Sequence, residues 1–394
     1  MKRSNAPVRA LERFLMPALL RVSRPRSGSP RAPVPAGPHR ALVCKWCCLG
    51  DAVVSLYALR EFKRRHPDVV IDVLVSARIA EVYRRAPEIG EVHVLPLTGR
   101  NLVRELLAPA LWSGLIRLLL KLRRARYAQF IDLELYRGTG PVLKRMLGIP
   151  FSRGFQVEGA APKHHDFEVP LPRHMPEWQC FYRVLGLDVP NGDPPPLYPA
   201  PETGGKPRLR ARIGIVFGSS FNWPEKKWPW EKYAELAGLL AREGHDCVLL
   251  GAPGEEREAE RIREAAGGKP ENAVGRLDYA GLIREVSACD AVVGNDTGPL
   301  HVAAACGIPT VTVFGPTDPR KWNPIGSDAI FLADLPCRPC YYLGAMPSCS
   351  HFSCLRRLET AVVAAAVRGA LARGRVLPGG GHAEDPRARM AQPG

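Results

Sequence analysis

The sequence predicts an α/β protein made of two domains, each built on a parallel sheet. Short apolar runs alternate with segments whose apolar residues have helical spacing, which is the pattern of a parallel sheet with crossover helices. This alternation stops at a proline-rich stretch over residues 189–208 and then starts again. Because a single core stops growing at about 250–300 residues, a chain of 394 residues is expected to divide there.

The first half of the chain contains four strand-like runs and two helical segments. The helical segments place leucine, valine and phenylalanine three and four residues apart. The second of them ends in basic residues, which the negative end of a helix dipole favours. The expected strands span residues 41–46, 69–75, 92–95 and 130–133, and the expected helices span residues 52–65 and 102–124.

The same alternation returns in the second half. There the expected strands span residues 213–217, 247–251, 291–294 and 310–314, and the expected helices span residues 230–243, 255–266, 300–306 and 355–373. We therefore predict a basic segment over 1–38, an N-terminal domain over 39–190, a linker over 191–208, a C-terminal domain over 209–374 and a disordered tail over 375–394. Two such domains leave a cleft, and ligands bind at the carboxyl ends of parallel strands.

The net charge of +16 is concentrated at the N-terminus, where residues 1–40 hold nine Lys or Arg and one acid. Such a segment favours an acidic partner, either an anionic membrane or nucleic acid, or it is a basic tail with no partner. Its apolar residues between Val8 and Val22 lie near helical spacing, which favours an interfacial helix over a cleaved signal peptide. No apolar stretch reaches the ~20 residues of a spanning helix, so we expect a soluble or peripheral protein.

Eleven cysteines are present, and several of them stand in apolar runs, which indicates reduced core residues and a cytoplasmic setting. Four others form a cluster, Cys337, Cys340, Cys349 and Cys354. Four thiols at close spacing are typical of a zinc or iron–sulfur site, although the second spacing is looser than in common zinc ribbons. Unliganded or redox-paired thiols are the alternative.

The turn over residues 294–301 follows an apolar strand and opens an alanine-rich helix. Asp296 and Thr297 can cap that helix, Gly298 lets the backbone approach a ligand, and Pro299 suits the first turn. The N–H groups of the helix start and the positive end of its dipole favour phosphate. A purely structural cap is the alternative interpretation.

Polar residues also follow three other strands. Asp51 comes after the first strand, as a general base or as a plain N-cap. A turn with Ser219, Ser220, Lys226 and Lys227 offers hydroxyls and ammonium groups that suit a diphosphate. The alternative interpretation is a solvated lysine pair beside a packed tryptophan. Glu255 and Glu256 follow another strand. A carboxylate there either accepts hydrogen bonds from ribose hydroxyls or is simply favoured by the positive end of the helix dipole.

Taken together, these motifs resemble the bacterial lipopolysaccharide heptosyltransferases, glycosyltransferase family nine. The resemblance is carried by residues 294–305, by Thr310–Pro319, by Leu49-Gly50-Asp51 and by the run from Lys226 to Pro229, in the expected order. The cysteine cluster also looks like a feature of many members. The resemblance covers about residues 40–372, and the basic segment before it lies outside.

The resemblance implies a GT-B fold, with two Rossmann-like domains facing a central cleft. It implies that Asp51 is the catalytic base and that Lys226 holds the diphosphate and stabilises the leaving group. It implies acceptor contacts at Lys45 and Arg60. The donor-binding residues it implies are Ser219, Ser220, Glu256 or its neighbour Glu255, Asp296, Thr297, Gly298 and His301. Cys47 and Cys48 depart from the family pattern, which has small hydroxyl residues before Leu-Gly-Asp.

The reaction implied is an inverting transfer of heptose from ADP-heptose to an anionic, lipid-linked lipopolysaccharide core sugar, with no metal required. The resemblance also places the enzyme in the cytoplasm, on the inner face of the inner membrane, with no nucleic acid as partner. Two alternatives stay open: a glycosyltransferase of the same fold that uses another nucleotide sugar, and a membrane-docked scaffold with a decayed site. Intact Asp51, Lys226 and Asp296 argue against the scaffold.

Overall fold

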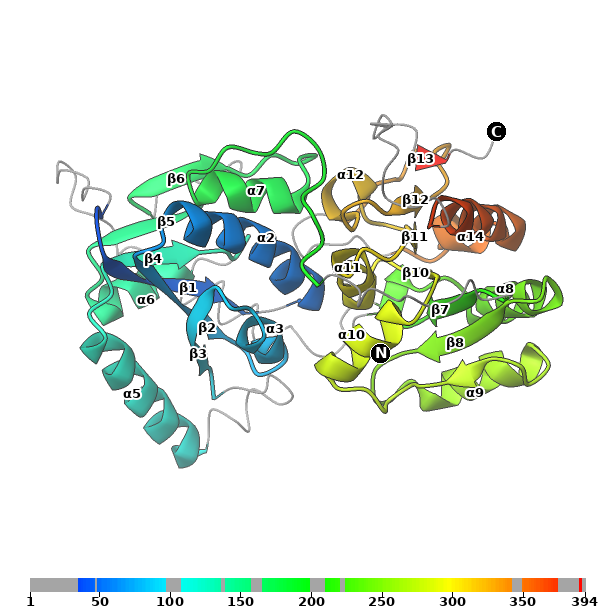
Figure 1. Ribbon diagram of the computed structural model, residues 1–394, viewed down its shortest axis with the longest axis horizontal. Coiled ribbons are helices and arrows are strands. Elements are labelled where there is room, and N and C mark those ends of the chain that lie inside the picture. Colours follow the sequence, from blue (N-terminus) through cyan, green and yellow to red (C-terminus); the bar gives the residue numbers. More distant parts are fainter. Residues whose placement is uncertain are drawn as a thin grey trace. The chain divides into compact units, whose positions relative to one another are not determined.

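The computed structural model describes residues 35–46, 48–96, 108–135, 139–156, 165–198, 210–219, 224–341, 349–374 and 390–391. Within these residues the chain forms two compact units, one up to Val189 and one from Pro190, which we call the first and the second domain. Figure 1 shows the first domain in blue to green and the second in green to red. The expected helix over Val8–Val22, the later part of the linker and most of the C-terminal tail lie outside the described residues.

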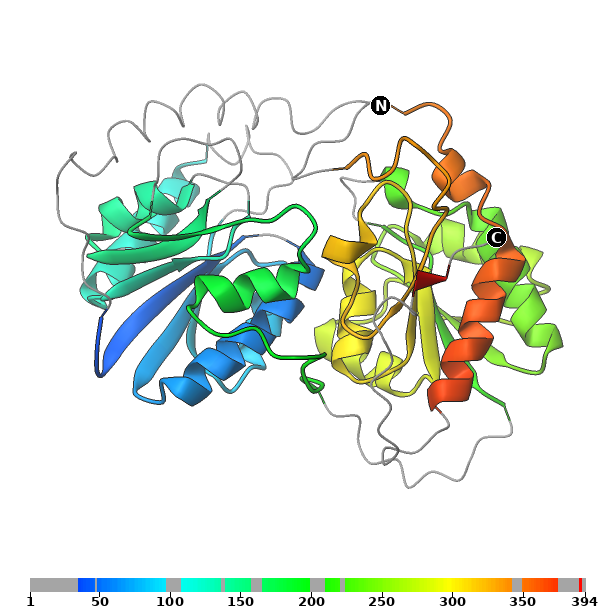
Figure 2. The same cartoon turned by 90° about the horizontal axis from the view of Figure 1, so that it is seen from above.

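The first domain is a six-stranded parallel sheet in the order β3-β2-β1-β4-β5-β6. The strands are β1 (His39–Lys45), β2 (Val69–Val75), β3 (Ile89–Val94), β4 (Gln129–Asp132), β5 (Phe151–Gln156) and β6 (Phe167–Pro170). Three helices, α2 (Leu49–Arg65), α3 (Ala80–Arg84) and α7 (Glu177–Val184), cover one face, and α5 (Pro109–Arg124) and α6 (Thr139–Leu147) cover the other (Figure 2). The direction of strand order reverses between β1 and β4, which is the switch point of a Rossmann sheet.

The second domain repeats this plan with a seven-stranded parallel sheet in the order β13-β12-β11-β10-β7-β8-β9. Its strands are β7 (Arg212–Val216), β8 (Asp246–Leu250), β9 (Glu271–Asn272), β10 (Ala291–Asn295), β11 (Thr310–Val313), β12 (Asp328–Ile330) and β13 (Met390–Ala391). Its helices are α8 (Trp230–Arg242), α9 (Glu256–Ala265), α10 (Tyr279–Ser287), α11 (Gly298–Ala305), α12 (Pro319–Trp322), α13 (Ser353–Arg356) and α14 (Thr360–Gly374), with a 3-10 turn at Pro224–Lys226. Here the switch point lies between β7 and β10.

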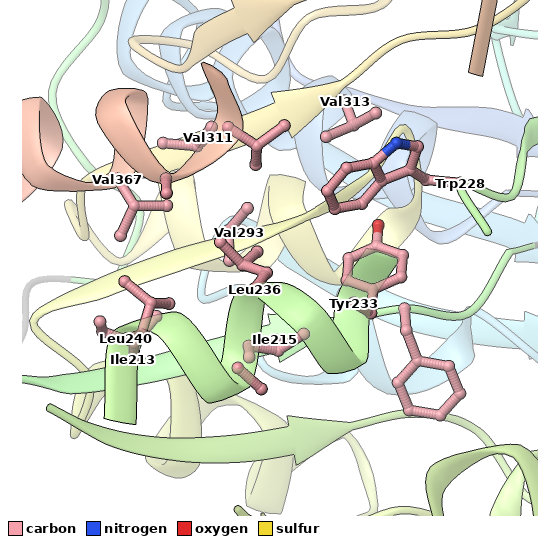
Figure 3. Close-up of a cluster of buried hydrophobic side chains, with 14 of the residues drawn as sticks. Ile213, Ile215, Trp228, Tyr233, Leu236, Leu240, Val293, Val311, Val313 and Val367 are labelled. Atoms are coloured by element: carbon pink, nitrogen blue, oxygen red, sulfur yellow. The ribbon is translucent and has the colours of Figure 1, made fainter. Parts of the chain in front are cut away.

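The core of the second domain lies between its sheet and α8, α9 and α14. Figure 3 shows Ile215, Val293 and Val313 from three neighbouring strands packed against Leu236 of α8 and Val367 of α14. The strands are apolar on both faces, as strands covered by helices on both sides must be. This core fixes the ends of β7 and β10, from which the loops of the candidate site leave.

Most expected elements lie within a few residues of their predicted bounds, and three differ. The helix expected over 102–124 is described from Pro109, because residues 97–107 lie outside the described part. The closing helix expected over 355–373 is two helices, α13 and α14. Residues 191–198 of the expected linker pack on the second domain: the N–H of Tyr198 donates to the carbonyl of Ala305 at 2.9 Å, and Leu197 is buried.

Within the described residues, no helix is both long enough and apolar enough to cross a membrane.

Candidate active site

A first candidate cluster lies in the first domain at the carboxyl end of β1, where Lys45 ends the strand. Its ammonium donates to Asp51 Oδ2 at 2.9 Å and to the carbonyl oxygen of Leu133 at 3.3 Å, and it lies 3.8 Å from Glu134 Oε1. The Lys45 side chain is 1% exposed. A buried charge is tolerated only when it is paired and hydrogen-bonded, and here the ammonium has two carboxylates and a carbonyl oxygen around it.

Asp51 reaches Lys45 because the chain turns sharply between β1 and α2. Cys48 has φ 71°, a left-handed conformation that is uncommon for a residue other than glycine, and α2 begins at the next residue. Asp51 therefore lies in the first turn of α2, where the helix dipole favours a carboxylate. The N-cap position is Cys48, with no side-chain cap, so interpreting Asp51 as a plain N-cap is wrong. Its side chain is 14% exposed, so part of the carboxylate reaches solvent.

Glu134 is a residue that the sequence analysis missed. It follows β4, the strand beside β1, and its Oε1 accepts the backbone N–H of Trp46 at 2.7 Å. Its side chain is 1% exposed. The rule that polar residues after neighbouring strands meet at a switch point would have found it, because Glu134 stands two residues after the end of β4.

A second candidate cluster lies at the switch point of the second domain. Lys226 Nζ donates to Asp296 Oδ2 at 2.9 Å and lies 5.0 Å from the centre of the Tyr341 ring. The side chains of Lys226 and Asp296 are 15% and 7% exposed. An ammonium has three donors, so Lys226 keeps hydrogen-bonding capacity for an anion while it contacts Asp296.

Trp228 and Asn295 hold the loop of Lys226 against the end of β10. The Trp228 indole is buried against Tyr233, with ring centres 5.0 Å apart (Figure 3). Asn295 Oδ1 accepts the Trp228 backbone N–H at 2.9 Å, and its Nδ2 donates to the carbonyls of Phe217 and Gly218 at 2.7 and 3.0 Å. One buried amide therefore joins the ends of β7 and β10.

The strands approach closely at this point because of Gly294. A Cβ there would lie 2.3 Å from the Val216 carbonyl oxygen, so only glycine fits. At Gly218, in the loop after β7, a Cβ would lie 2.3 Å from the Glu255 carboxylate, so a larger residue there would displace that side chain. These two positions let the turns after β7, β8 and β10 meet.

The start of α11 has the expected backbone but not the expected side-chain cap. Thr297 is the N-cap, with Gly298 and Pro299 in the first turn, but its hydroxyl donates to the Asn295 carbonyl at 3.4 Å and caps no N–H. Asp296 is turned toward Lys226 instead. Because the first N–H groups of a helix have no intrahelical partner, this helix start presents donors beside an ammonium. His301 lies one turn further along and is 8% exposed.

The structure separates the two candidate ribose carboxylates. Glu255 Oε2 accepts the Ala252 N–H at 2.9 Å, and Glu255 Oε1 lies 3.6 Å from Lys227 Nζ, so its carboxylate faces the loop after β7. Glu256 instead accepts the Gly254 N–H at 2.8 Å, which lowers the pKa of its carboxyl. The structure brings Glu255, rather than Glu256, to the switch point. Ser219 lies at the end of the same loop, and Ser220 lies outside the described residues.

Arg60 lies apart from Lys45 and Asp51. It is nine residues beyond Asp51 on α2, or about 13 Å along the helix axis. Its Nε donates to Glu88 Oε1 at 2.6 Å, and its side chain is 41% exposed. The structure therefore does not bring Arg60 to the Lys45 cluster.

Tyr341, the ring beside Lys226, is held by its neighbour Arg338. The Arg338 guanidinium donates to the carbonyls of Gly315, Leu332 and Thr317, and burial lowers its pKa. The Tyr341 N–H donates to the Pro316 carbonyl at 3.0 Å. The segment after β12 is thus tied to the loop after β11, which places the ring over the ammonium.

The four cysteines of the cluster lie in the same region of the second domain. The pKa of Cys354 is raised to about 11, mainly by burial and to a smaller extent by the neighbouring cysteines, while Arg338 acts to lower it. All four are free thiols. In the described part of the chain, no three such side chains are arranged at the spacing of metal ligands.

These features define a class of protein. Two Rossmann-like domains, one with a carboxylate held by a buried lysine and one with an ammonium at a helix start, are the parts of a GT-B glycosyltransferase. The model of glycosyltransferase family 9 (heptosyltransferase) matches residues 116–345, and the chain belongs to that family.

Curated relatives and solved structures agree with this family. The chain is 28% identical to lipopolysaccharide heptosyltransferase 2 of Salmonella typhimurium over 71% of its own length and 84% of the relative. It is 28% identical to lipopolysaccharide heptosyltransferase 1 of Pseudomonas aeruginosa over 76% and 86%. The structure of Escherichia coli ADP-heptose lps heptosyltransferase II, 22% identical, superimposes with a TM-score of 0.63 over 85% of this chain and 99% of that one, which supports the GT-B fold.

Proposed function

We propose that this enzyme transfers heptose from ADP-heptose to an inner-core sugar of lipopolysaccharide, with inversion at the anomeric carbon. The observation that carries the proposal is the pair of switch-point clusters, Lys45–Asp51 and Lys226–Asp296, in a chain of the heptosyltransferase family. The first cluster offers a base for an acceptor hydroxyl. The second offers a cation and a helix start for a diphosphate.

The acceptor step uses the Asp51 carboxylate. Lys45 holds Oδ2, and the exposed part of the carboxylate takes the proton of the acceptor hydroxyl. The oxygen then attacks the anomeric carbon as the bond from that carbon to the diphosphate oxygen breaks. The new glycosidic bond forms on the face opposite the leaving group, which inverts the configuration.

The donor step uses Lys226 and the start of α11. As ADP leaves, negative charge grows on its diphosphate, and the Lys226 ammonium and the N–H groups at Thr297 and Gly298 stabilise that charge. Because an ammonium and backbone amides neutralise the diphosphate, we propose catalysis without a metal ion. Glu255 or Glu256 would accept hydrogen bonds from the ribose, with Ser219, Ser220 and His301 completing the donor site.

The donor is tested by ligand protection and by transfer. We expect ADP-heptose to raise the melting temperature and to label a lipid A–Kdo acceptor with heptose, read by mass spectrometry. If a UDP-sugar stabilises the protein and ADP-heptose does not, the chain is a glycosyltransferase of the same fold with another donor. The matched control is Lys226→Gln, which removes the cation from the diphosphate site.

The acceptor is tested in cells. Mass spectrometry of core oligosaccharide from a strain lacking this gene should show a core truncated at one heptose, restored by the wild-type gene and not by Asp51→Asn. An unchanged core would contradict lipopolysaccharide as the acceptor.

We propose that the enzyme works in the cytoplasm as a peripheral protein on the inner face of the inner membrane, because its acceptor is lipid-linked.

We further propose a structural zinc ion at the cysteine cluster, with no part in the reaction. Four thiols supply a suitable donor set, but they are not at ligand spacing, so binding requires their side chains to turn toward one another. Metal analysis of purified protein should give about one zinc per chain, lost in Cys337→Ser/Cys340→Ser. A metal-free wild type would leave the cluster as reduced thiols.

A further inference from the structure

We propose that the outer side of α5 and the adjoining end of α6 form the surface that docks this enzyme on an anionic phospholipid bilayer. This α5–α6 face comprises Trp112, Ile116, Leu120 and Met146, with the basic residues Arg117, Arg123 and Arg124. The proposal assigns a surface to the proposed peripheral membrane location. It rests on the proposed function only because a lipid-linked acceptor is the reason for this enzyme to bind a membrane. Figure 1 shows α5 along the outer edge of its domain.

Large apolar side chains are exposed on this face. Trp112, Ile116 and Leu120 of α5 are 50%, 56% and 48% exposed, and their spacing of four residues puts them in one stripe. Met146, on α6, is 49% exposed. Among the described residues, these four and Val70 are the exposed large hydrophobic residues, so the exposed apolar surface gathers in one place.

The fold does not need this stripe. The adjoining side of α5 already packs on the sheet, where Leu122 joins Cys44 and Phe130 in a buried cluster and Leu118 and Leu119 pack against it. A helix that covers a sheet needs one apolar stripe, and the rest of its surface is normally polar. The outer stripe of α5 therefore calls for a partner outside the domain.

An apolar cavity of about 340 Å³ lies beside the stripe. Its walls include Leu74, Leu95, Ile116, Leu119, Leu143 and Met146, and every lining side chain is apolar. A cavity without a polar group offers nothing to orient a sugar or a nucleotide. It suits hydrocarbon, such as the methylene groups of an acyl chain.

The charge around the stripe selects an anionic partner. Helix α5 carries four basic residues and no acid. Lys121 pairs with Glu91, whereas Arg117, Arg123 and Arg124 are exposed and, in the described part of the chain, have no carboxylate partner. A second copy of the α5–α6 face carries the same positive charge and would be repelled by this face. Residues 1–40 of this chain would be repelled as well, because they carry nine basic residues and one acid.

A bilayer matches both properties at once. Anionic headgroups meet the arginines, and the hydrocarbon just below them receives the tryptophan and isoleucine, as in other helices that lie in the membrane interface. An acidic protein surface would meet the arginines but would leave the all-apolar cavity without an occupant.

Flotation of the full-length protein with vesicles tests this assignment. We expect binding to phosphatidylcholine vesicles that contain phosphatidylglycerol, weaker binding to phosphatidylcholine alone, and weakening by salt. Trp112→Ser/Ile116→Ser should lower the partition coefficient at least about tenfold, because two interfacial apolar groups are lost. Arg117→Gln/Arg124→Gln should lower it by about tenfold or more on anionic vesicles only.

Matched controls separate docking from folding and from activity. Val70→Ser removes an exposed apolar residue elsewhere in the same domain, and Arg242→Gln removes an exposed arginine of the second domain; both should bind as wild type does. All variants should keep wild-type transfer to a deacylated, soluble acceptor. If the wild type transfers no heptose but the α5 variants still lose vesicle binding, the proposed function fails and the docking surface stands.

Two results would overturn the docking surface. One is unchanged vesicle binding in both double variants, which would assign the membrane contact to another segment such as residues 1–40. The other is a wild-type dimer, seen by light scattering, that Trp112→Ser/Ile116→Ser dissociates, which would assign the face to a second copy of the chain.

Discussion

Both domains place a lysine beside a carboxylate near the switch point of a parallel sheet, but the two lysines differ in how deeply they are buried. Each has a Rossmann sheet, and in each a lysine from the loop or strand end on one side of the switch point meets a carboxylate. In the first domain, Lys45 is 1% exposed and serves two carboxylates and a carbonyl. In the second, Lys226 is 15% exposed and has Asp296 and an aromatic ring beside it. Topology therefore places the pair in both domains, whereas burial leaves the Lys226 ammonium more accessible than that of Lys45.

The largest expected effect concerns Asp51, the carboxylate that contacts the buried Lys45. Asp51→Asn should lower kcat by roughly 10²–10⁴, because the base for the acceptor hydroxyl is lost. Affinity for ADP should stay unchanged, since the nucleotide contacts lie in the other domain. Transfer kinetics and ADP titration measure the two quantities. Asp188→Asn, at a carboxylate that is 92% exposed, is the control, and equal activity in both variants would remove the base assignment.

The next effect compares the two lysines directly. Lys45→Met leaves Glu134 buried without its cation, so we expect the free energy of unfolding to fall by about 3–5 kcal/mol. Lys226→Met should cost less, about 1–3 kcal/mol, because its ammonium is 15% exposed and a single carboxylate, Asp296, loses its cation. Urea denaturation of both variants gives the difference. Equal losses would show that burial does not separate the two clusters.

The third effect compares the catalytic activity of variants at two adjacent lysines, Lys226 and Lys227. Lys226→Gln should lower kcat by about 10²–10³ and weaken ADP binding, because the growing charge on the diphosphate loses its ammonium. Lys227→Gln, whose ammonium lies with Glu255 and Glu258, is the adjacent control and should have a much smaller effect on kcat. A larger loss in Lys227→Gln would reverse the assignment within the motif.

The smallest effect concerns a surface pair on α2 of the first domain. Arg64 and Arg65 hold the pKa of Glu61 at about 2, below its usual value. A depressed carboxyl pKa stabilises the fold above about pH 4 and loses that contribution as the pH falls toward 2. Glu61→Gln should therefore cost a little stability at pH 7 and much less at pH 2, measured by thermal unfolding across that range. A pH-independent difference would contradict the ion-pair explanation.

Much of the fold followed from apolar patterning, because buried parallel strands are continuous apolar runs. The first-domain helix α6 and strands β5 and β6 were missed, since the strands Phe151–Gln156 and Phe167–Pro170 contain glycine, proline and charged residues. The helix α10 was missed as well, although Asp278 caps it at the Gly281 N–H.

The site was predictable wherever a residue follows a strand, and unpredictable where a distant segment supplies it. Asp51 and Asp296 stand shortly after strand ends, and Glu134 would have been found by the same rule, whereas Lys45, the last residue of β1, was implied by the family resemblance. Tyr341 could not be found, because its place beside Lys226 depends on Arg338 binding three carbonyls of other loops. Nor does spacing decide between Glu255 and Glu256, since adjacent residues at a helix start point in different directions.

Asn295 has a consequence for how tightly a donor can bind. Its amide joins the end of β7, the Trp228 backbone and the end of β10 through three hydrogen bonds, all in the buried interior. The loop carrying Lys226 and the turn carrying Asp296 are therefore ordered relative to each other before a nucleotide arrives. Binding then loses little conformational entropy in the protein, so more of the attraction between the ammonium and the diphosphate remains as affinity.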